Sequence, residues 1–355
     1  VTVKHGAFAP NGSPGIAGTG GGAGGGGILK DGGTGGSGLV KFKNKVNDAN
    51  RTYIFNASTT WKNNFGARKA EYLIVGGGGG GGYRTGGGGG AGGFRAGTGL
   101  DIESDTLKIA VGAGGAATPA SPVTSSNGGG SFIQGGTYHR GSNGGGGGAS
   151  SAPGAPGWNG QKGASGGGAS RSFIANSGGT GGPAIALSPT TGHAPAYPTQ
   201  GSLSQTTSTS VQGFDGAAGN LGAGTGSAGG GGGSAQAGFA GTTDIGGNGG
   251  NGLTSSITGT SLPYAGGGAG ANNNSTAPGA EVDKSFGGDF GKSGGNSAAV
   301  NAPSAPQVAT ERAESGRINS GGGGGGGFGQ YPDTNAPFNV GASGSSGIVV
   351  LKITE

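Results

Sequence analysis

The fold is decided by one stretch of sequence, Tyr72-Leu73-Ile74-Val75-Gly76-Gly77-Gly78-Gly79-Gly80-Gly81-Gly82. A glycine run cannot form a stable α-helix, because glycine is about 1 kcal/mol less favourable than alanine there. It can form an extended helix with three residues per turn, which has no internal hydrogen bonds. Once buried, the amides of such a helix must bond to other groups. Without a Cβ atom in the way, neighbouring glycine segments can approach closely and bond to one another. The stretch therefore predicts a bundle of polyglycine-II helices entered from a strand.

The same pattern recurs along the chain. A second seven-residue run covers Gly321–Gly327, and five-residue runs cover Gly86–Gly90, Gly144–Gly148 and Gly229–Gly233. Other stretches place glycine at every third position, as at Gly154 to Gly166, Gly213 to Gly222 and Gly246 to Gly252. Period three matches three residues per turn. All-glycine runs are expected in the middle of the bundle, and period-three stretches on its outside. Collagen is the competing interpretation, but the runs are short and there are only 16 prolines.

Composition limits the kind of core that the chain can build. Glycine supplies 101 of 355 residues, and the apolar fraction is 30%, against roughly 45–50% in ordinary globular domains. Such bias usually indicates disorder, but the organised glycine pattern, the framing strands and a net charge of only +5 favour an ordered fold. Lysines and arginines are scattered, so nucleic-acid binding is not expected. There is no cysteine. No apolar run approaches the ~20 residues of a membrane span, so membrane insertion is not expected either.

Strand-like segments frame the glycine region and predict a small β base. They are Thr52–Phe55, Tyr72–Val75, Leu107–Val111 and Ile348–Ile353. Phe55, Trp61 and Phe65 are expected in the core of this base. The stretch 35–43 resembles 345–353, since each is a Gly/Ser lead-in followed by a strand. The fold class predicted is mainly irregular and β, with polyglycine-II helices closed by the base. The expected parts are 1–45, the tail of an upstream glycine-rich unit; 46–115, the base and first glycine helices; 116–340, the bundle with its end loops; and 341–355, the closing strand.

Aromatic and histidine side chains between the glycine runs are the candidate binding residues. A glycine lattice cannot bury many large rings, so most should lie in turns or loops at the bundle ends, where binding residues usually sit. Aromatic side chains give a large contact area at low entropy cost. The candidates are Tyr138, His139, Trp158, His193, Tyr197, Tyr264, Phe290 and Tyr331. The alternative is that the aromatic residues cap the bundle and shield its last hydrogen bonds.

No pattern in the sequence indicates catalysis, a metal or a cofactor. His5, His139 and His193 are far apart and have no metal-ligand spacing. The stretch Gly287 to Ser293 is similar to a phosphate loop, but Phe286 occupies the position of the required first glycine. Asp101, Glu103 and Asp105 begin like a calcium loop, yet the glycine and the closing acid of such a loop are missing. The chain is therefore not expected to be an enzyme.

Four places in the sequence resemble the glycine-rich domains of bacteriophage tail fibres and adhesins. They are Thr52 to Trp61, Tyr72 to Gly82, the block formed by Ile109 to Gly115 and Ser125 to Phe132, and Gly344 to Ile353. The family usually has a proline-bearing turn after its tryptophan, whereas Asn63 to Ala67 stands there in this chain. The resemblance implies a polyglycine-II sandwich in a virion or otherwise extracellular fibre. It also implies that variable end loops bind a bacterial surface receptor, either an outer-membrane protein or a glycan. Other fibre subunits are expected as partners, with a homotrimer as one arrangement.

Two alternatives of other classes remain open at this point. The first is a self-assembling extracellular filament subunit, which needs a detachable strand and a matching groove; residues 39–55 are a candidate for that strand. The second is an ice-binding protein, which needs a flat face of small residues with period three. Outside 154–166 and 213–222 the sequence departs from that period.

Overall fold

The computed structural model divides the chain into two units, Val1–Asp48 and Ala49–Glu355. The described residues all lie in the second unit, and the expected strand and glycine runs of residues 1–45 lie outside them. The described residues are 51–64, 66, 68–102, 106–118, 124–135, 138–151, 158–171, 186–187, 210–220, 226–242, 245–271, 288, 294–295, 299–301, 308–328 and 340–354. Within them the structure contains strands β1 to β14 and no helix.

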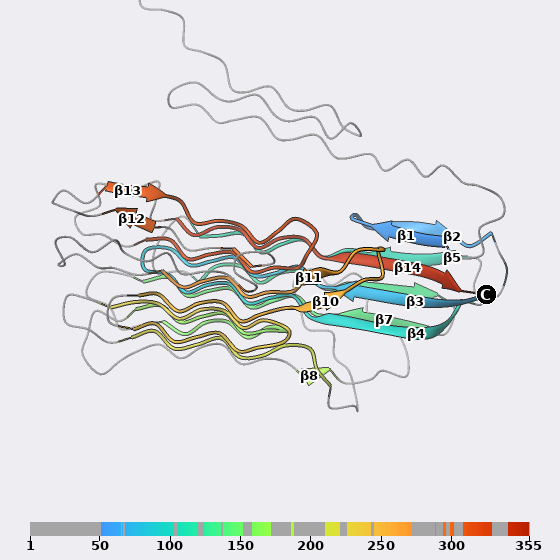
Figure 1. Cartoon of the computed structure of the whole chain (residues 1–355), viewed down its shortest axis with the longest axis horizontal. Helices are drawn as coiled ribbons and strands as arrows, with labels where there is room; N and C mark the ends of the chain where they lie inside the picture. Colours follow the sequence, from blue (N-terminus) through green and yellow to red (C-terminus); the bar gives the residue numbers. More distant parts are fainter. Residues whose placement is uncertain are drawn as a thin grey trace, which may run out of the picture. The chain divides into compact units, whose positions relative to one another are not determined.

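One four-stranded antiparallel sheet has the order β1-β14-β3-β4 (Figure 1). Its strands are β1 (Arg51–Phe55), β14 (Ile348–Thr354), β3 (Arg68–Val75) and β4 (Phe94–Ile102). The central strand β14 comes from the end of the chain, and its Val349 pairs with Phe55 on one side and Ile74 on the other. Strands from the beginning and the end of unit Ala49–Glu355 therefore lie side by side in one sheet.

A second four-stranded antiparallel sheet has the order β2-β5-β6-β7. Its strands are β2 (Thr59–Lys62), β5 (Thr106–Ala110), β6 (Ser131–Gly135) and β7 (Tyr138–Ser142). Residues of β5 and β6 alternate between buried and more exposed, which is the pattern of a sheet with one face on a core. We refer to the two sheets together as the β base.

The core of the β base draws on both sheets. Ile74 and Leu351 from the first sheet cluster with Leu107, Ile109 and Ile133 from the second, and all five are buried. The strands expected to form one base thus lie in two sheets that share a core, and β5 does not pair with β3 or β14. Tyr53 and Trp61 both pack against this core. Their rings meet edge to face, with centroids 5.0 Å apart. Phe65 lies outside the described residues.

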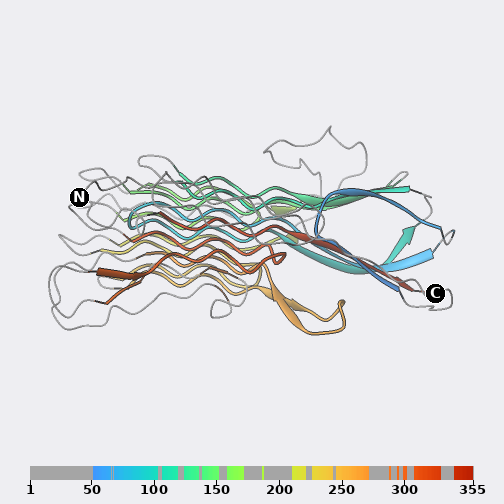
Figure 2. The same cartoon turned by 90° about the horizontal axis from the view of Figure 1, so that it is seen from above.

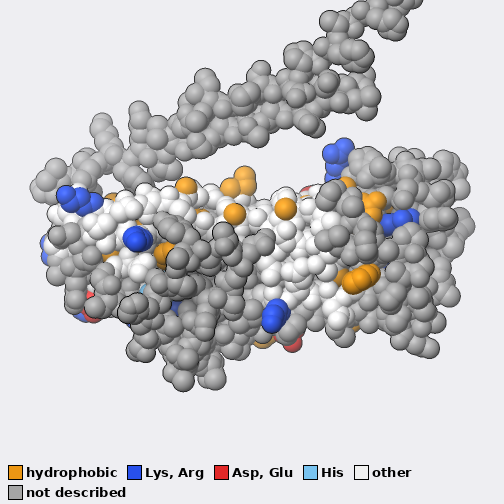
Figure 3. Space-filling view, turned by 180° about the vertical axis from the view of Figure 1, so that it is seen from behind, with side chains coloured by type: hydrophobic (Ala, Val, Ile, Leu, Met, Phe, Trp, Pro, Cys, Tyr) orange, Lys and Arg blue, Asp and Glu red, His pale blue; other side chains and the backbone are white. Residues whose placement is uncertain are grey.

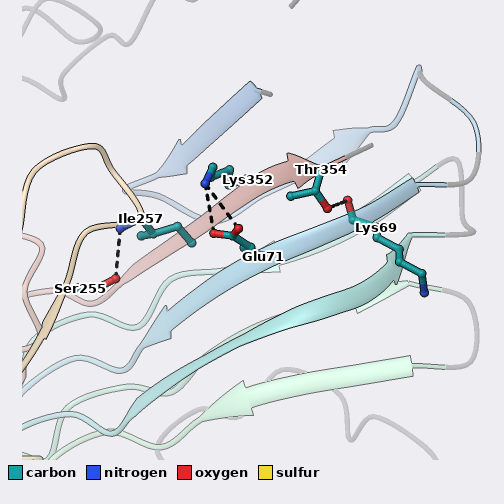
Figure 4. A network of polar contacts seen from close by, with 6 residues as sticks. All are labelled: Lys69, Glu71, Ser255, Ile257, Lys352 and Thr354. Atoms are coloured by element: carbon teal, nitrogen blue, oxygen red, sulfur yellow. Dashed lines mark hydrogen bonds and ion pairs between the residues drawn. The ribbon is translucent and has the colours of Figure 1, made fainter. Parts of the chain in front are cut away.

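Polar contacts join the central strands β14 and β3 near their partly exposed ends (Figure 4). Lys352 on β14 pairs with Glu71 directly opposite on β3, with Nζ and Oε2 3.3 Å apart. The Thr354 hydroxyl donates to the Lys69 carbonyl at 3.0 Å. Both contacts hold the end of the chain in register with β3.

Six strands of the β base continue directly into glycine-rich segments. The segments are 76–82 after β3, 86–93 before β4, 111–118 after β5, 124–130 before β6, 143–149 after β7, and 341–347 before β14. The register of the strands therefore also sets where each segment begins. Further segments, such as 226–233 and 321–327, run beside them in the glycine-rich region (Figures 1 and 2).

Backbone hydrogen bonds join these segments with a period of three. In segment 76–82 the amides donate at 2.8 to 3.0 Å. Gly76, Gly79 and Gly82 donate to carbonyl groups in 87–93. Gly77 and Gly80 donate to carbonyl groups in 126–129. Gly78 and Gly81 donate to carbonyl groups in 342–345. Carbonyl groups of the same segment accept from three more segments, at residue 115, at 145–148 and at 324–327. One glycine run thus bonds to six neighbours, and we call the set of mutually bonded segments the glycine lattice.

The close packing of the lattice requires glycine. A Cβ atom added at Gly81 would lie 2.0 Å from the Gly325 carbonyl oxygen, and one added at Gly89 would lie 2.1 Å from that of Gly79. Both contacts are to backbone atoms, which cannot move aside without breaking their own hydrogen bonds. The interior of the lattice is therefore mostly main chain, with small side chains such as those of Ala91 and Ala149 also buried.

Two segments that the sequence suggested as end loops are strands. Residues 138–142 form β7 in the β base, and Leu262–Tyr264 forms β11, which pairs with β10 (Leu253–Ser255). The hairpin β10–β11 lies where the lattice meets the base (Figures 1 and 2). Two more short pairs complete the described strands, β8 (Ala186–Leu187) with β9 (Ser210–Val211), and β12 (Ala299–Asn301) with β13 (Val308–Glu311).

Candidate functional site

The structure does not bring the described candidate binding residues together. Tyr138 and His139 lie on β7 in the β base, Tyr264 lies on β11, and Trp158 lies in the lattice. The other four candidates lie outside the described residues: His193, Tyr197, Phe290 and Tyr331.

Tyr264 is part of the core. It is 2% exposed and clusters with Leu73, Val75 and Val350 of the first sheet. The guanidinium of Arg317 lies 5.4 Å from the centre of its ring, within the range of a cation–π contact. This placement favours a structural role for Tyr264, so we leave it out of the binding surface proposed below.

Trp158 lies at the distal end of the lattice, by which we mean the end away from β3, where the turn Tyr83–Thr85 joins the first two glycine segments. Its amide donates to the Ser170 hydroxyl at 2.9 Å, and its carbonyl accepts from the Ser170 amide at 3.1 Å. The next residue, Arg171, donates its amide to the Thr85 carbonyl in that turn. The Trp158 side chain is 39% exposed. Hydrogen bonds thus hold both the amide and the carbonyl group of Trp158, while its side chain presents a large aromatic surface to solvent.

His139 lies on the outer face of the second sheet. Its ring centre is 5.1 Å from that of Phe132 on β6, and the rings are tilted by 45°. Burial, followed by the nearby Arg95 and Arg140 guanidinium groups, lowers the pKa of His139 below its usual value. The imidazole is therefore mainly neutral near pH 7 and stands beside two fixed positive charges. Such a cluster can donate hydrogen bonds to a polar or anionic group.

The sequence did not point to a set of large apolar side chains on a lateral face of the lattice. Phe214 is 43% exposed and Phe239 is 47% exposed. Their segments are neighbours, because the Gly238 amide donates to the Asp215 carbonyl at 3.1 Å. Ile245 follows on the next segment, where Thr242 donates to its carbonyl. Each phenylalanine stands beside a glycine of a period-three stretch, so that period was the available signal.

The described surface is otherwise dominated by backbone and small polar side chains. Figure 3 shows separate apolar side chains on a largely white surface, with a few lysine and arginine side chains among them. Dispersed apolar side chains of this kind are normal on protein surfaces and are not by themselves a binding site.

A groove runs along the surface between segments 111–118 and 124–130. Its cavity volume is about 440 Å³. Ala113, Gly114 and Ala116 line one side and Asn127 and Gly130 the other, with Ser58 and Phe132 where the groove reaches the β base. None of the lining side chains is charged. The groove therefore offers mainly main-chain groups to a ligand, and it ends beside the Phe132–His139 pair.

The described residues contain neither a group of metal-ligating side chains nor a long apolar helix. In that part of the chain, no three or more His, Asp or Glu side chains gather where they could hold a metal ion. The same residues include no helix long and apolar enough to cross a bilayer.

Comparison with known proteins identifies the family. A family model described as a glycine-rich domain matches residues 54–252. This match begins in β1 and ends just before β10, so it covers most of the β base and about half of the lattice. No curated protein matches the chain. Because the family match spans more than half of the 355 residues, the chain belongs to the glycine-rich domain family.

Proposed function

We propose that the chain is a structural and receptor-binding component of a phage tail fibre or a similar viral appendage. In this proposal the glycine segments are polyglycine-II helices, the β base closes them at one end, and side chains at the distal end contact a host-surface receptor. The receptor is an outer-membrane protein or a glycan, and the protein works in the virion, outside the host cell.

The observation that carries the proposal is the six-neighbour, period-three hydrogen bonding of segment 76–82. A polyglycine-II helix has three residues per turn, so each third residue faces the same neighbour. Segment 86–93 repeats the pattern: Gly86, Gly89 and Gly92 donate to 321–327, while Gly87, Gly90 and Gly93 donate to 143–149. A strand in a sheet bonds to two neighbours only, so a six-neighbour run favours the helical description.

Such a lattice is suited to hold loops in place without a large apolar core. Its rigidity comes from main-chain bonds, so residues at its end can vary without disturbing the interior. The distal turn Tyr83–Thr85 illustrates this support: Ser150 accepts from the Tyr83 amide at 3.0 Å, and Ser151 donates to the Arg84 carbonyl. Binding residues are often carried on loops of a rigid scaffold. Membership of the glycine-rich domain family and the resemblance to phage adhesins support the same assignment.

The two alternatives have less support in the described structure. Residues 51–55, part of the candidate filament strand, pair with β14 of their own chain. An ice-binding face would need small residues only, and exposed Ala237, Ala240 and Asn248 do follow that pattern. Phe214 and Phe239, on neighbouring segments, are exposed as well, and such large side chains interrupt the flat surface that ice would need.

The test is binding of the full chain to a panel of Gram-negative cells and to vesicles made from their outer membranes. Trp158→Ala and Tyr331→Ala should each weaken attachment at least tenfold and leave thermal unfolding unchanged. Phe214→Ala is the matched control, since it also removes a partly exposed aromatic ring, but from the lateral face. We expect this control to bind like the wild type.

Two results would count against the proposal. Equal loss of binding with Phe214→Ala would place the receptor contact on the lateral face instead of the distal end. No binding to any cell or vesicle, together with regular filaments in electron micrographs of the purified chain, would favour the filament subunit.

A further inference from the structure

The interior of the glycine lattice shows how its segments recognise each other. A segment presents an N–H or C=O group to a given neighbour at every third residue, as Gly77 and Gly80 do toward 126–129. These bonds join backbone groups, and a few side chains add others: Asn127 Oδ1 accepts from the Gly147 amide at 2.8 Å, and Ser125 Oγ donates to the Gly81 carbonyl at 2.7 Å. A segment at the edge of the lattice must therefore present the same groups, with the same spacing, to whatever lies beyond it.

Segments 111–118 and 124–130 are such edge segments. They bond to each other through residues three apart, with Ser126 donating to the Ala116 carbonyl at 3.0 Å and Gly129 donating to that of Ala113 at 2.8 Å. On the inner side, the Gly115 amide donates to Gly78, and its carbonyl accepts from Gly344. The inner sides of both segments are thus satisfied by the lattice.

Toward the groove, the backbone groups of these segments have no partner among the described residues. Neither the N–H nor the C=O group of Gly114, Asn127 or Gly130 makes a backbone hydrogen bond, and the amides of Ala113 and Ala116 donate to none. Ala113 and Ala116 are three residues apart, as are Asn127 and Gly130. Residues of an interior segment that bond to the same neighbour have this same spacing.

The walls of the groove leave room for main chain. Along the lattice they consist of glycine, alanine, serine and asparagine, with Val111 at the base end, and Ala113 and Ala116 are exposed. A Cβ atom added at Gly129 would approach the Ala113 nitrogen to 3.1 Å, compared with about 2.0 Å from backbone oxygens at the interior positions Gly87 and Gly88. Gly129 is therefore less crowded than those interior positions, whereas a Cβ atom added at Gly114 would still meet the Gly344 carbonyl oxygen at 2.0 Å on the inner side.

We propose that this groove is a vacant position of the glycine lattice, which binds an extended segment rich in glycine and other small residues from a second polypeptide chain. The added segment bonds through its backbone to Ala113 and Ala116 on one wall and to Asn127 and Gly130 on the other. This is the lattice counterpart of strand addition to an open sheet edge. The uncharged walls disfavour a charged glycan or nucleic acid as the occupant. Phe132, at the base end, limits how far the segment can extend toward the β base.

The probe is a synthetic peptide that repeats Gly-Gly-Ala and carries a lysine at each end for solubility. It is added to the purified full chain, and amide hydrogen exchange is followed residue by residue. We expect slower exchange, by at least tenfold, at Ala113, Gly114, Asn127 and Gly130, which are the amides that gain partners. A peptide with valine in place of each glycine should give no protection, because its side chains prevent close approach.

A pair of matched variants locates the effect. Ala116→Leu fills the groove from an exposed position and should weaken peptide binding at least tenfold. Ala240→Leu makes the same change at an exposed alanine of the lateral face and should leave binding unchanged. If Ala116→Leu fails to fold, Ala113→Leu replaces it. Should the chain self-associate and Ala116→Leu abolish this, the second polypeptide is another copy of the chain, which supports the proposal.

Three outcomes overturn the proposal: no protection of the groove amides at millimolar peptide, equal protection by the valine peptide, or protection by soluble glycans instead. The assay contains no cells, so a failure of receptor binding does not affect it. Conversely, a chain that binds cells normally while the peptide fails would leave the proposed function standing and remove only this inference.

Discussion

The β base and the glycine lattice are stabilised by opposite means within one unit of the chain. In the base, side chains such as Leu73, Leu107 and Val350 are removed from water, each contributing about 1.5–3 kcal/mol when fully buried. In the lattice there is almost no side chain to bury, and the contacts are backbone hydrogen bonds, each contributing a net ~0.5–1.5 kcal/mol. The base can therefore exchange one apolar residue for another, whereas lattice positions such as Gly81 and Gly89 accept only glycine.

The comparison also explains why the two regions need each other. Glycine loses more conformational freedom on folding than any other residue, so a run such as Gly76–Gly82 is costly to order alone. The base reduces this cost because its strands continue into the segments and fix where they begin. The junction is held by buried polar side chains: Ser131 donates to the Val75 carbonyl at 2.7 Å, and Ser142 donates to that of Gly93.

The largest effect is expected from a side chain added inside the lattice. In Gly324→Val the new Cβ atom would lie 2.0 Å from the Ala342 carbonyl oxygen, so the segment cannot keep its place. We expect no cooperative unfolding transition by calorimetry and no soluble folded protein. Ala240→Val adds the same bulk at an exposed position and should unfold like the wild type. An unchanged melting temperature for Gly324→Val would show that the lattice contacts are not those described.

Truncating the core of the base should have a smaller, measurable effect. Leu351 is fully buried between the sheets, and Leu351→Ala should lower the free energy of unfolding by about 2–5 kcal/mol. Leu351→Met keeps the volume and should cost less than about 1.5 kcal/mol. Chemical denaturation measures both. If Leu351→Met lowered the free energy of unfolding as much as Leu351→Ala, the base would tolerate substitutions as poorly as the lattice does. The contrast between the two regions would then be wrong.

The junction should be intermediate between the two regions. The Ser131 hydroxyl accepts from the Gly112 amide at 2.9 Å and donates to the Val75 carbonyl, and Ser131→Ala leaves both buried groups unpaired. We expect a loss of about 1–3 kcal/mol, with faster amide exchange at Gly112. Ser58→Ala is the control, because Ser58 makes one comparable bond, to the Val111 amide, at an exposed site. Equal effects of the two changes would contradict a special role for the junction.

The smallest effect concerns pH and is confined to the base. Burial, Arg95 and Arg140 lower the pKa of His139 in the folded state, so below its ordinary value near 6.5 the unfolded chain binds the proton more readily. The contribution of His139 to the free energy of unfolding is complete above pH 6.5 and is lost as the pH falls through the pKa of His139 in the folded state. A nuclear magnetic resonance titration should place His139 below 6.5, and Arg95→Gln should raise its pKa. His139→Gln should remove the pH dependence in this window; a titration at or above 6.5 would contradict the argument.

Predictions of individual strands succeeded where apolar residues alternate or cluster. The expected strands at 52–55, 72–75, 107–111 and 348–353 correspond to β1, β3, β5 and β14. Strand β4 was missed because Gly97 and Gly99 disguise it; Gly97 is required since a Cβ there would meet the Tyr72 hydroxyl at 2.7 Å. The sequence predicts a loop at β7, because Tyr138, His139 and Arg140 have no apolar alternation. The structure pairs β7 with β6, from Tyr138 opposite Gly135 to Ser142 opposite Ser131, and this pairing makes it a strand.

The candidate site was predictable only in its residue types. Composition showed that aromatic rings would be rare, and Trp158 is exposed as expected for a binding residue. Tyr264 looks the same in sequence, yet it is buried because β11 places it against Leu73 and Val350. The groove has no sequence signal at all, since it consists of backbone groups that have no partner within the described part of the chain. Only the arrangement of segments 111–118 and 124–130 reveals it.

The sequence by itself determined that the chain would avoid helices, that strands would lead into glycine runs, and that the interior would contain backbone in place of side chains. These follow from the absence of a Cβ atom and from the β-branched residues beside the runs. Only the tertiary structure decided which segment bonds to which, and that the base is two sheets with one core. The physical reason is that glycine runs are chemically alike. Their pairing is therefore set by the strands that deliver them and by the lengths of their connections, which act only once the whole unit has folded.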